Sequence, residues 1–250
     1  MLKKTHLGEV VIELSEIDST NNYAMRLINA GMAEHGMVIR ADFQTAGKGQ
    51  LGNKWQAEES KNLLFSFILD TSDIHPDKQF FLNAAACLSV ADLLMSNYEL
   101  REVSIKWPND IYTGNKKIAG ILIENVIRGN TWSHAIIGIG LNVNQTQFQD
   151  LNHASSIQLE TNKSHKVPMV MKHLLKKLQK NCTDFYTSEN LLLEQYNKNL
   201  RGMNELIHFK KNHQLYKGRL LGVTSQGLII IEHDGKQKNY QHKEIELQFN

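Results

Sequence analysis

Short apolar runs alternate with amphipathic helical stripes over the first two hundred residues. Apolar side chains at i, i+3 and i+4 spacing predict helices over Lys78–Tyr98 and from Met171 to Phe185. A shorter helix is predicted between the capping side chains after Asp18 and the stop signal at Gly31, and another over Leu191–Leu200. Strands are predicted over further runs, which are Gly8–Leu14, Gly36–Phe43, Asn62–Leu69, Val103–Trp107, Lys117–Val126 and Trp132–Val143.

The pattern changes after Gly202. From about Ile207 onward, short β-like runs alternate with turn signals such as Tyr216-Lys217-Gly218 and His233-Asp234-Gly235. This alternation predicts a small, separate β-barrel over residues 202–250. The helical stripe over Lys78–Tyr98 needs a sheet to cover, so residues 1–201 are predicted to form an α+β domain with a mixed β-sheet and helices packed on one face.

Composition limits the class of protein. The chain has 250 residues, 41% of them hydrophobic and only 3 of them proline, so it can form a proper core and is neither disordered nor fibrous. Its net charge of +2 makes no general electrostatic case for nucleic acid or a membrane surface. The N-terminal apolar run ends at Glu13, and no run approaches the ~20 apolar residues of a membrane span. Cys87 and Cys182 have no CxxC partner, so a cytoplasmic protein without disulfides is expected.

Several well-known catalytic motifs are absent. The sequence has no GxSxG elbow, no HExxH and no EF-hand loop, and its 11 histidines lack metal-ligand spacing. A nucleophilic hydrolase or a zinc enzyme is therefore not supported. The groups that could take part in binding or catalysis are lysines, backbone amides and neutral polar side chains. Such groups suit the binding and transfer of a phosphoryl or adenylyl group.

The polar segment from Gln44 to Trp55 predicts an unusually long loop. Its part Gly47-Lys48-Gly49-Gln50-Leu51-Gly52-Asn53-Lys54-Trp55 joins glycines that permit close backbone approach to cationic lysines, which favours phosphate binding. An apparent strand follows, so the loop is neither a P-loop nor a dinucleotide-binding turn. Taken alone, a surface hairpin with Trp55 in the core is the simpler interpretation.

A second candidate is Lys106-Trp107-Pro108-Asn109-Asp110, a lysine at a strand end followed by a rigid turn. A lysine among apolar neighbours is costly to bury unless an anion pairs with it, which favours a ligand carboxylate or phosphate. Lys117 repeats this arrangement at the start of a second apolar strand. Lysines that snorkel to solvent remain the simpler alternative.

Neutral polar groups and strand glycines supply two further candidates. Ser19-Thr20-Asn21 with Gln44 suits an uncharged amide or urea, because neutral groups bind such a ligand without leaving a buried charge unpaired. Helix capping explains Ser19 and Thr20 but not Gln44. Between Gly138 and Asn144, glycines within a strand indicate either close approach by a bulky group or, equally, a β-bulge.

Taken in order, these segments resemble those of biotin–protein ligase, also called biotin–acetyl-CoA-carboxylase ligase. The resemblance covers roughly the whole chain; Lys106–Asp110 is its most diagnostic piece and the C-terminal barrel its least. Each segment alone is weak evidence for the resemblance, but the order and spacing of all five together are specific for this family. The segments that carry the resemblance are Asp18–Asn22, Gln44–Trp55, Lys106–Asp110, Lys117–Glu124 and Gly138–Asn144.

The resemblance implies a two-step reaction. Biotin and MgATP form biotinyl-5′-adenylate and pyrophosphate, and a lysine of the biotin carboxyl carrier domain of acetyl-CoA carboxylase then takes the biotinyl group as an amide. Lys106 is implied to be catalytic, because a fixed cation would stabilise charge that develops between carboxylate and phosphate. The residues implied to bind biotin are Ser19, Thr20, Asn21, Gln44, Gly47, Lys48, Gly49, Gln50, Lys106, Gly120, Gly138 and Gly140. Those implied to bind ATP or the adenylate are Lys48, Gln50, Trp55, Lys106, Asn109, Lys117 and Asn142.

Individual roles follow from the same resemblance. Ser19, Thr20 and Gln44 would hydrogen-bond the ureido ring of biotin, and residues 48–50 lie on the loop that closes over biotin and the α-phosphate. Residues 145–153 correspond to the segment that orders over the adenylate. Magnesium is expected to be held mainly by the ATP phosphates, and the sequence does not indicate protein ligands for it.

The loop departs from the family pattern. The family motif usually reads GRGRRGR, whereas its arginine positions here are Lys48, Gln50, Leu51 and Asn53. An arginine can hold a phosphate through two hydrogen bonds and a glutamine cannot, a difference of about 1–3 kcal/mol. The departure predicts that biotinyl-adenylate escapes faster than from an arginine-bearing relative.

Other assignments remain open at this point. A lipoate–protein ligase or octanoyltransferase shares the architecture, but a straight acyl chain would leave Ser19, Thr20 and Gln44 without polar partners. An inactive biotin- or nucleotide-binding module is a further alternative, against which Lys106 argues. Many bacterial relatives also repress transcription through an N-terminal DNA-binding domain. Only 18 residues precede Ser19, so no DNA role is expected, and no membrane partner; a homodimer is possible. The barrel resembles the SH3-like appendage of the family, which implies help in closing the site or docking the carrier domain.

Overall fold

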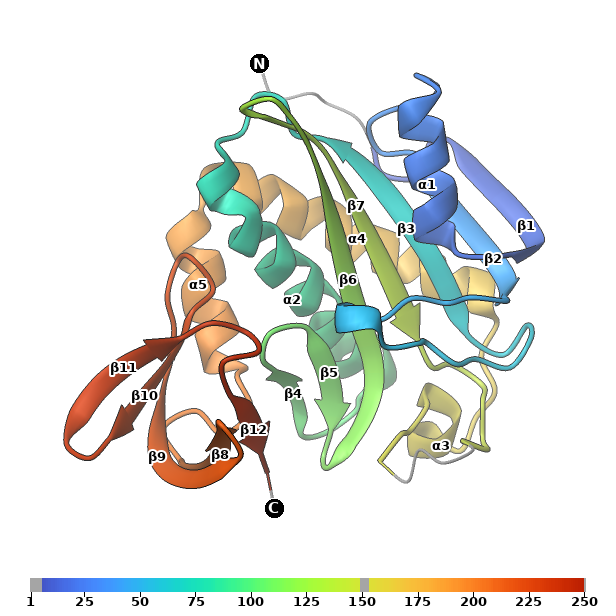
Figure 1. Ribbon diagram of the computed structural model, residues 1–250. Helices are drawn as coiled ribbons and strands as arrows, with labels where there is room; N and C mark the ends of the chain where they lie inside the picture. The colour runs from blue at the N-terminus through green and yellow to red at the C-terminus, as the bar shows by residue number, and fades with distance from the viewer. Residues whose placement is uncertain (1–5, 149–152, 250) are drawn as a thin grey trace.

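A seven-stranded mixed sheet forms the larger part of the molecule (Figure 1). The structure is a computed structural model that describes residues 6–148 and 153–249. The strand order is β1-β2-β3-β7-β6-β5-β4, in which β1 and β2 are parallel and all other neighbours are antiparallel. The strands are β1 (Val11–Ile17), β2 (Val38–Gln44), β3 (Leu63–Asp70), β4 (Val103–Lys106), β5 (Asp110–Thr113), β6 (Lys116–Arg128) and β7 (Thr131–Leu141).

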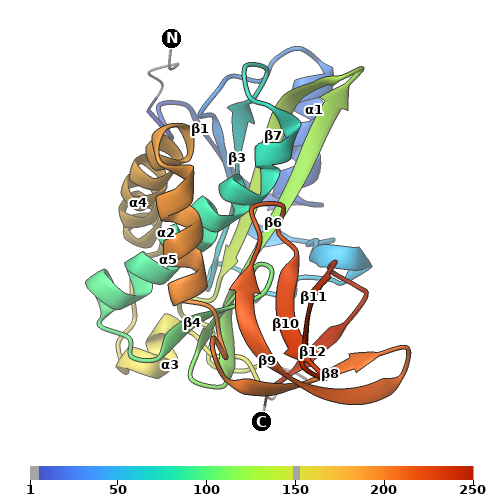
Figure 2. The same ribbon diagram turned by 90° about the vertical axis from the view of Figure 1, so that its left-hand side faces the viewer.

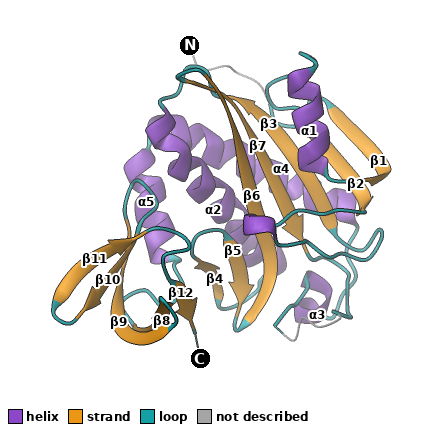
Figure 3. Ribbon diagram, in the orientation of Figure 1, coloured by secondary structure: helices purple, strands orange, loops and turns teal. Residues whose placement is uncertain are grey.

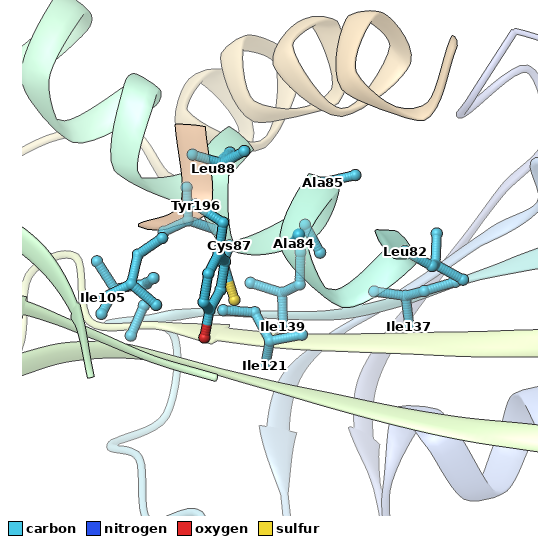
Figure 4. Packing of buried hydrophobic residues seen from close by; sticks show 14 of the residues in the cluster. Leu82, Ala84, Ala85, Cys87, Leu88, Ile105, Ile121, Ile137, Ile139 and Tyr196 are labelled. Carbon is cyan, nitrogen blue, oxygen red and sulfur yellow. The ribbon is translucent and has the colours of Figure 1, made fainter. Parts of the chain in front are cut away.

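Three long helices cover one face of this sheet (Figure 2). They are α2 (Gln79–Tyr98), which follows a 3-10 turn at Pro76–Lys78, α4 (Val167–Thr187) and α5 (Glu189–Lys198). Helix α2 packs against the sheet, and α4 and α5 pack against α2. Figure 4 shows the resulting core, in which Leu82, Ala84 and Cys87 of α2 lie toward Ile121, Ile137 and Ile139 of the sheet.

Helix α2 is buried on most of its sides, and this explains its composition. Its apolar window is long enough and apolar enough to cross a membrane by length and composition alone, yet 67% of that window is buried inside the protein. Leu82, Ala86, Val90 and Leu93 are all fully or almost fully enclosed. A helix that is apolar on every side is expected where two layers cover it.

Helix α1 (Thr20–Asn29) lies on the opposite face of the sheet (Figure 3). Ala24 and Ile28 pack there against Ile39, Ile68 and Ile136, which point away from the α2 side because successive strand residues alternate between faces. The α+β class with a mixed sheet and a helical layer is confirmed. The helices are not confined to one face, since α1 covers part of the second one.

The cross-strand register places glycines beside polar residues on the α1 face. Ser66 on β3 lies opposite Gly138 on β7, which lies opposite Leu122 on β6. Two residues further along β7, Gly140 lies opposite Gly120. This face of the sheet therefore carries little side-chain bulk where β3, β7 and β6 adjoin.

The chain after Gly202 forms a second, five-stranded sheet with the order β11-β10-β9-β8-β12. Its strands are β8 (Leu206–Lys211), β9 (Gln214–Val223), β10 (Ile229–His233), β11 (Lys236–Tyr240) and β12 (Glu246–Gln248). The Trp107 indole donates to the Gly227 carbonyl at 3.0 Å, and the amide of Val223 donates to Asn197 Oδ1 at 2.8 Å. Apolar residues of both sheets form one continuous core. The antiparallel C-terminal unit is as expected, and the domain boundary at residues 201 and 202 stays a prediction.

A few local features differ from expectation. The first strand begins at Val11, because Gly8 turns with a positive φ of 84° and donates to the Gly36 carbonyl. A short helix α3 (Ile157–Thr161), capped by the Ser156 side chain, was not predicted because five residues are too few for a periodic pattern. The remaining predicted helices and strands of the larger sheet lie within two residues of their expected bounds, except that α4 begins at Val167, four residues before the predicted start. Both cysteines are buried and free.

Candidate active site

A cleft of about 730 Å³ lies between the α1 face of the main sheet and the C-terminal sheet. Figures 1 and 2 show the C-terminal sheet beside the β4–β5 end of the main sheet. Nearly all of the residues singled out from the sequence line this cleft: Ser19, Thr20, Asn21, Gln44, Lys48, Gly49, Gln50, Trp55, Lys106, Asn109, Lys117, Gly120, Gly138 and Gly140. Segments that are far apart in the chain thus meet in one place.

The neutral end of the cleft is built by the first turn of α1. Ser19 caps the helix only through its backbone, because its side chain makes no capping hydrogen bond. Thr20 and Asn21 lie inside the helix, with side chains turned toward the sheet. The Gln44 carbonyl oxygen accepts from the Thr20 amide at 2.8 Å and from the Thr20 hydroxyl at 3.1 Å. Side-chain capping therefore does not account for Ser19 and Thr20.

Ser66 and Glu124 belong to the same end and were not singled out from the sequence. Ser66 Oγ, which is fully buried, lies 2.7 Å from Thr20 Oγ1 and 2.6 Å from Asn21 Oδ1. Asn21 Nδ2 donates to Glu124 Oε2 at 2.7 Å. Ser66 sits within an otherwise apolar strand, and a lone hydroxyl in such a run was the available signal. The role of Glu124 depends on the register of β6 and has no signal in the sequence.

Two glycines of β7 permit these close approaches. A Cβ at Gly138 would lie 2.3 Å from Asn21 Oδ1, and a Cβ at Gly140 would lie 2.4 Å from the Trp55 indole. Both distances are far below ordinary contact, so neither position accepts a side chain without movement of its neighbour. Neither glycine marks a register shift in the pairing with β3 or β6, so the β-bulge alternative is wrong.

The loop from Gln44 to Trp55 folds over this glycine surface. A bridge between Lys48 and Lys54 closes it, and a 3-10 turn at Gln50–Gly52 forms its tip. Trp55 rests on the sheet next to Gly120 and Gly140, so it is neither a residue of the main core nor a freely exposed ring. Gln50 Oε1 and Trp55 Nε1 are buried and have no hydrogen-bond partner among the described residues. The loop thus holds unsatisfied polar atoms at the cleft.

Lysines line both ends of the cleft: Lys48 lies beside the neutral groups, and Lys106 and Lys117 lie at the other end. Lys117 Nζ pairs with Asp110 at 2.7 Å and lies 5.6 Å from the centre of the Trp55 ring, whereas Lys48 Nζ pairs with Glu124 at 3.1 Å. Lys106, at the end of β4, has no ion pair within the part of the chain that the structure describes. Burial lowers the pKa of Lys106; Asp110 opposes this shift, and the nearby Arg201 and Lys117 add to it. A half-buried cation in this setting favours an anionic ligand.

Two predicted residues do not line the cleft. Gly47 is buried within the loop, where a Cβ would meet the Trp55 carbonyl oxygen at 2.5 Å. Asn142 is buried beyond the end of β7, and its Nδ2 donates to the Ser155 carbonyl at 2.9 Å. Its Oδ1 has no hydrogen-bond partner among the described residues.

Comparison with known proteins identifies the family. The sequence matches the model of the Biotin/lipoate A/B protein ligase family over residues 14–142, which is just over half of the chain. It is 30% identical over 254 residues to the bifunctional ligase/repressor BirA of Bacillus spizizenii, covering 98% of this chain and 76% of that protein. The chain belongs to the biotin/lipoate A/B protein ligase family.

Other biotin ligases also match this chain in sequence or in structure. The biotin–[acetyl-CoA-carboxylase] ligase of Mycobacterium tuberculosis is 31% identical over 134 residues, covering 53% of this chain and 48% of that protein. The solved structure of biotin protein ligase from Aquifex aeolicus, in complex with biotin and ATP, superposes with a TM-score of 0.81 at 28% identity, covering 97% of this chain and 100% of that one. This member of the family is therefore an enzyme of the ligase class.

The segment after Asn144 is described in part. Gln145 is buried, and its side-chain oxygen accepts from Asn62 Nδ2 at 2.5 Å and from the Glu58 amide at 3.0 Å. At the far side, the Lys117 amide donates to the His153 carbonyl at 2.7 Å. The middle of the segment predicted to order over the adenylate, residues 149–152, lies outside the described residues.

Substitution of Gly140 by alanine is expected to displace Trp55. The new Cβ would overlap the indole, whereas Gly120→Ala, whose Cβ would lie 3.0 Å from the same ring, is expected to act more weakly. Trp107 and Trp132 are buried, so acrylamide quenching of tryptophan fluorescence reports mainly on Trp55. Quenching should increase in the order parent, Gly120→Ala, Gly140→Ala. A Trp55→Phe control assigns the signal, and equal quenching of parent and Gly140→Ala would contradict the contact.

Proposed function

We propose that this chain is a biotin–protein ligase that activates biotin with MgATP as biotinyl-5′-adenylate, releases pyrophosphate, and transfers biotin to a lysine of the biotin carboxyl carrier domain of acetyl-CoA carboxylase. The observation that carries the proposal is the two-ended character of one cleft. Neutral, buried hydrogen-bonding groups occupy one end, with Lys48 and its partner Glu124 beside them, and Lys106 and Lys117 lie at the other. Biotin has the same arrangement, with an uncharged ureido ring at one end and a carboxylate at the other.

The neutral end favours biotin over a straight acyl chain. Ser19, Thr20 and Asn21 are all almost fully buried, and Ser66 and Gln44 complete their network. A ureido carbonyl and its two N–H groups can exchange hydrogen bonds with such groups. Lipoate or octanoate would leave them facing a hydrocarbon chain, and the cost of unpaired buried polar groups gives strong discrimination. The lipoate ligase alternative is accordingly the weaker one.

The charged end suits the chemistry of adenylation. A fixed cation near the biotin carboxylate and the α-phosphate would stabilise the negative charge that develops as the carboxylate attacks phosphorus. Lys106 is assigned this role. Lys117 neighbours it at the same end of the cleft, already paired with Asp110, and is assigned to phosphate neutralisation.

Magnesium enters this proposal as part of the substrate MgATP. Among the described residues no cluster of three or more His, Cys, Asp or Glu side chains could hold a metal ion. Mg²⁺ commonly binds through substrate phosphates and one or two protein oxygens. Among the residues that line this end of the cleft, Asp110, paired with Lys117, and Glu246 supply carboxylate oxygens.

Several further expectations belong to the proposal and stay predictions. The acceptor is a carrier domain, the protein acts in the cytoplasm without DNA or membrane partners, and a homodimer is possible. The names of the relatives support the acceptor, since one of them is a biotin–[acetyl-CoA-carboxylase] ligase. Retention of the adenylate is tested separately below, because it depends on the loop.

The first test is mass spectrometry of an acceptor carrier domain after incubation with the protein, MgATP, and biotin, lipoate or octanoate in parallel. We expect a mass gain on one carrier lysine with biotin alone. A carrier in which that lysine is replaced by arginine controls for chemical acylation. A gain with lipoate or octanoate would move the chain to the rival activity, and no gain despite biotin binding in calorimetry would indicate an inactive module.

Lys106→Ala is expected to slow formation of biotinyl-adenylate by about 10²–10³-fold, while biotin affinity changes by less than tenfold, because the lysine acts mainly on charge that develops during the reaction. Pyrophosphate release and calorimetric biotin titration measure the two effects. Lys116→Ala removes a neighbouring exposed lysine outside the cleft and should leave both unchanged. The assignment is wrong if Lys117→Ala abolishes adenylation whereas Lys106→Ala retains a rate within threefold of the parent.

Gln50→Arg is expected to lengthen the residence of biotinyl-adenylate by about tenfold or more, because a guanidinium forms charge-assisted hydrogen bonds with phosphate. Rapid gel filtration of the complex, followed by chromatography of the released adenylate, measures its half-life. Gln50→Leu changes the side chain without adding charge and should not retain the adenylate. An unchanged half-life in Gln50→Arg would show that the departure at this position does not control escape.

A further inference from the structure

Trp107, Pro108 and Asn109 form the turn that joins β4 to β5, and charged residues of the cleft stand at its two ends. Lys106 ends β4 and lies opposite Asp110, the first residue of β5, in the ladder between the two strands. These five residues all line the cleft. The place of the Lys106 ammonium therefore depends on how the turn between these strands is held.

Two residues of the turn are held by the neighbouring sheets. The Asn109 carbonyl accepts from the Ile121 amide of β6 at 3.0 Å, and the Asn109 side chain donates to the Ile121 carbonyl. The Trp107 indole donates to the Gly227 carbonyl at 3.0 Å. These contacts act on the two outer residues of the turn. The middle residue, Pro108, is held from another side.

The carbonyl oxygen of Pro108 is bound from the helical layer. Asn83 Nδ2 on α2 and the Tyr196 hydroxyl on α5 each donate to it at 2.8 Å. Cys87 Sγ, one turn after Asn83 on α2, lies 3.9 Å from the same oxygen. Figure 4 shows Tyr196 beside Cys87, with the tyrosine oxygen toward the sheet. One carbonyl thus receives donors from two helices, on the face of the sheet opposite the cleft.

These donors exceed what burial of the carbonyl requires. One hydrogen bond satisfies a buried carbonyl, whereas here two side chains supply one each. Burial raises the pKa of Tyr196, so its hydroxyl stays protonated and donates. The tyrosine is fully enclosed, and the Phe80 ring packs against it edge to face with the ring centres 5.2 Å apart. Donors fixed by packing restrict where the carbonyl, and with it the turn, can lie.

Lys106 depends on its backbone more than the other assigned lysines of the cleft do. The ammonium groups of Lys48 and Lys117 are each fixed by a carboxylate. Lys106 has no ion pair among residues 6–148 and 153–249, and its Nζ lies 5.7 Å from the centre of the Tyr112 ring. The turn is therefore the main restraint on this ammonium.

We propose that Asn83 and Tyr196 are positioning residues for adenylation, which hold the Pro108 carbonyl and so fix the turn that places the Lys106 ammonium at the reacting groups. The proposal rests on the proposed function and on the role assigned there to Lys106. Neither positioning residue lines the cleft, so both act through the backbone of the turn. A misplacement of about 1 Å in a reacting group can slow a reaction by about 10²-fold.

The test uses the double variant Asn83→Ala/Tyr196→Phe in the full chain. At saturating biotin and MgATP we expect the single-turnover rate of biotinyl-adenylate formation to fall about tenfold or more. The calorimetric Kd values for biotin and MgATP should stay within about twofold of the parent, because the lost restraint acts on the transition state. Tyr196→Phe alone keeps the ring and its packing against Phe80, and a loss of about threefold or more in this variant decides the test if the double variant does not fold.

Dependence on Lys106 separates positioning from a general loss of structure. In a Lys106→Ala background, the same two substitutions should slow adenylation by less than about twofold, because the group that they position is absent. An equal relative loss in both backgrounds would overturn the proposal. A parental rate in the double variant with Lys106 present would also overturn it.

Ser89→Ala is the matched control on α2. It removes a fully buried hydroxyl that donates to the Ala85 carbonyl at 2.7 Å and accepts from Asn181 Nδ2 of α4 at 3.0 Å. Loss of these hydrogen bonds should lower the thermal unfolding midpoint. The adenylation rate should stay within about twofold of the parent. A tenfold loss of rate in this control would show that any weakening of the helical layer slows the reaction, and would overturn the specific role of the two donors.

A readout that needs no activity follows Lys106 itself. Burial lowers the pKa of Lys106; Asp110 opposes this shift, and Arg201 and Lys117 add to it. A released turn exposes the ammonium, so its pKa should rise toward the ordinary value in the double variant and stay unchanged in Ser89→Ala. Competitive acetylation with acetic anhydride across pH, quantified by peptide mass spectrometry, measures this pKa. An unchanged Lys106 pKa in the double variant refutes the positioning, whereas a parent that forms no adenylate refutes the proposed function.

Discussion

The site depends on the lack of side chains on one patch of the sheet. At Gly138 and Gly140 the backbone of β7 is approached so closely by Asn21 and Trp55 that even a methyl group would overlap them. Because of this contact, the first turn of α1 and the long loop after β2 can both rest on the sheet. Gly120, across from Gly140 on β6, extends the bare patch toward Lys117. The exposed strand backbone at these glycines is therefore what lets Asn21 and Trp55 pack directly against the sheet.

The two ends of the cleft differ in the charge of the groups that line them. At one end, the hydroxyls of Thr20 and Ser66 and the amide of Asn21 hydrogen-bond to one another and carry no net charge. At the other end, Lys106 has no ion pair among the described residues and is destabilised in its charged form by burial. A ligand that is neutral at one end and anionic at the other satisfies both. In the proposed reaction, the same division would separate binding of the ureido ring from stabilisation of the charge that develops.

The elements and the candidate residues could be predicted to a large extent because they rest on local patterns. Helix α2 and strands β3, β6 and β7 follow from apolar periodicity, and the segments with Lys106 and Gly138 follow from short motifs. The places of Ser66, Glu124 and the C-terminal sheet at the cleft could not be predicted in the same way. Their parts in the cleft depend on which strands adjoin, on the face that each residue takes, and on how the second sheet docks through Trp107 and Asn197.

The amino-acid sequence by itself determined the α+β class, the family, and the residue types available for chemistry, because periodicity, turn signals and ordered motifs are properties of neighbouring residues. Only the tertiary structure decided that α1 lies on the face opposite α2, that Ser19 and Thr20 serve the cleft rather than a side-chain cap, and which lysines are already paired. Those outcomes depend on contacts between residues distant in the chain. Burial, charge pairing and steric clearance are set by such contacts, and local sequence carries no direct record of them.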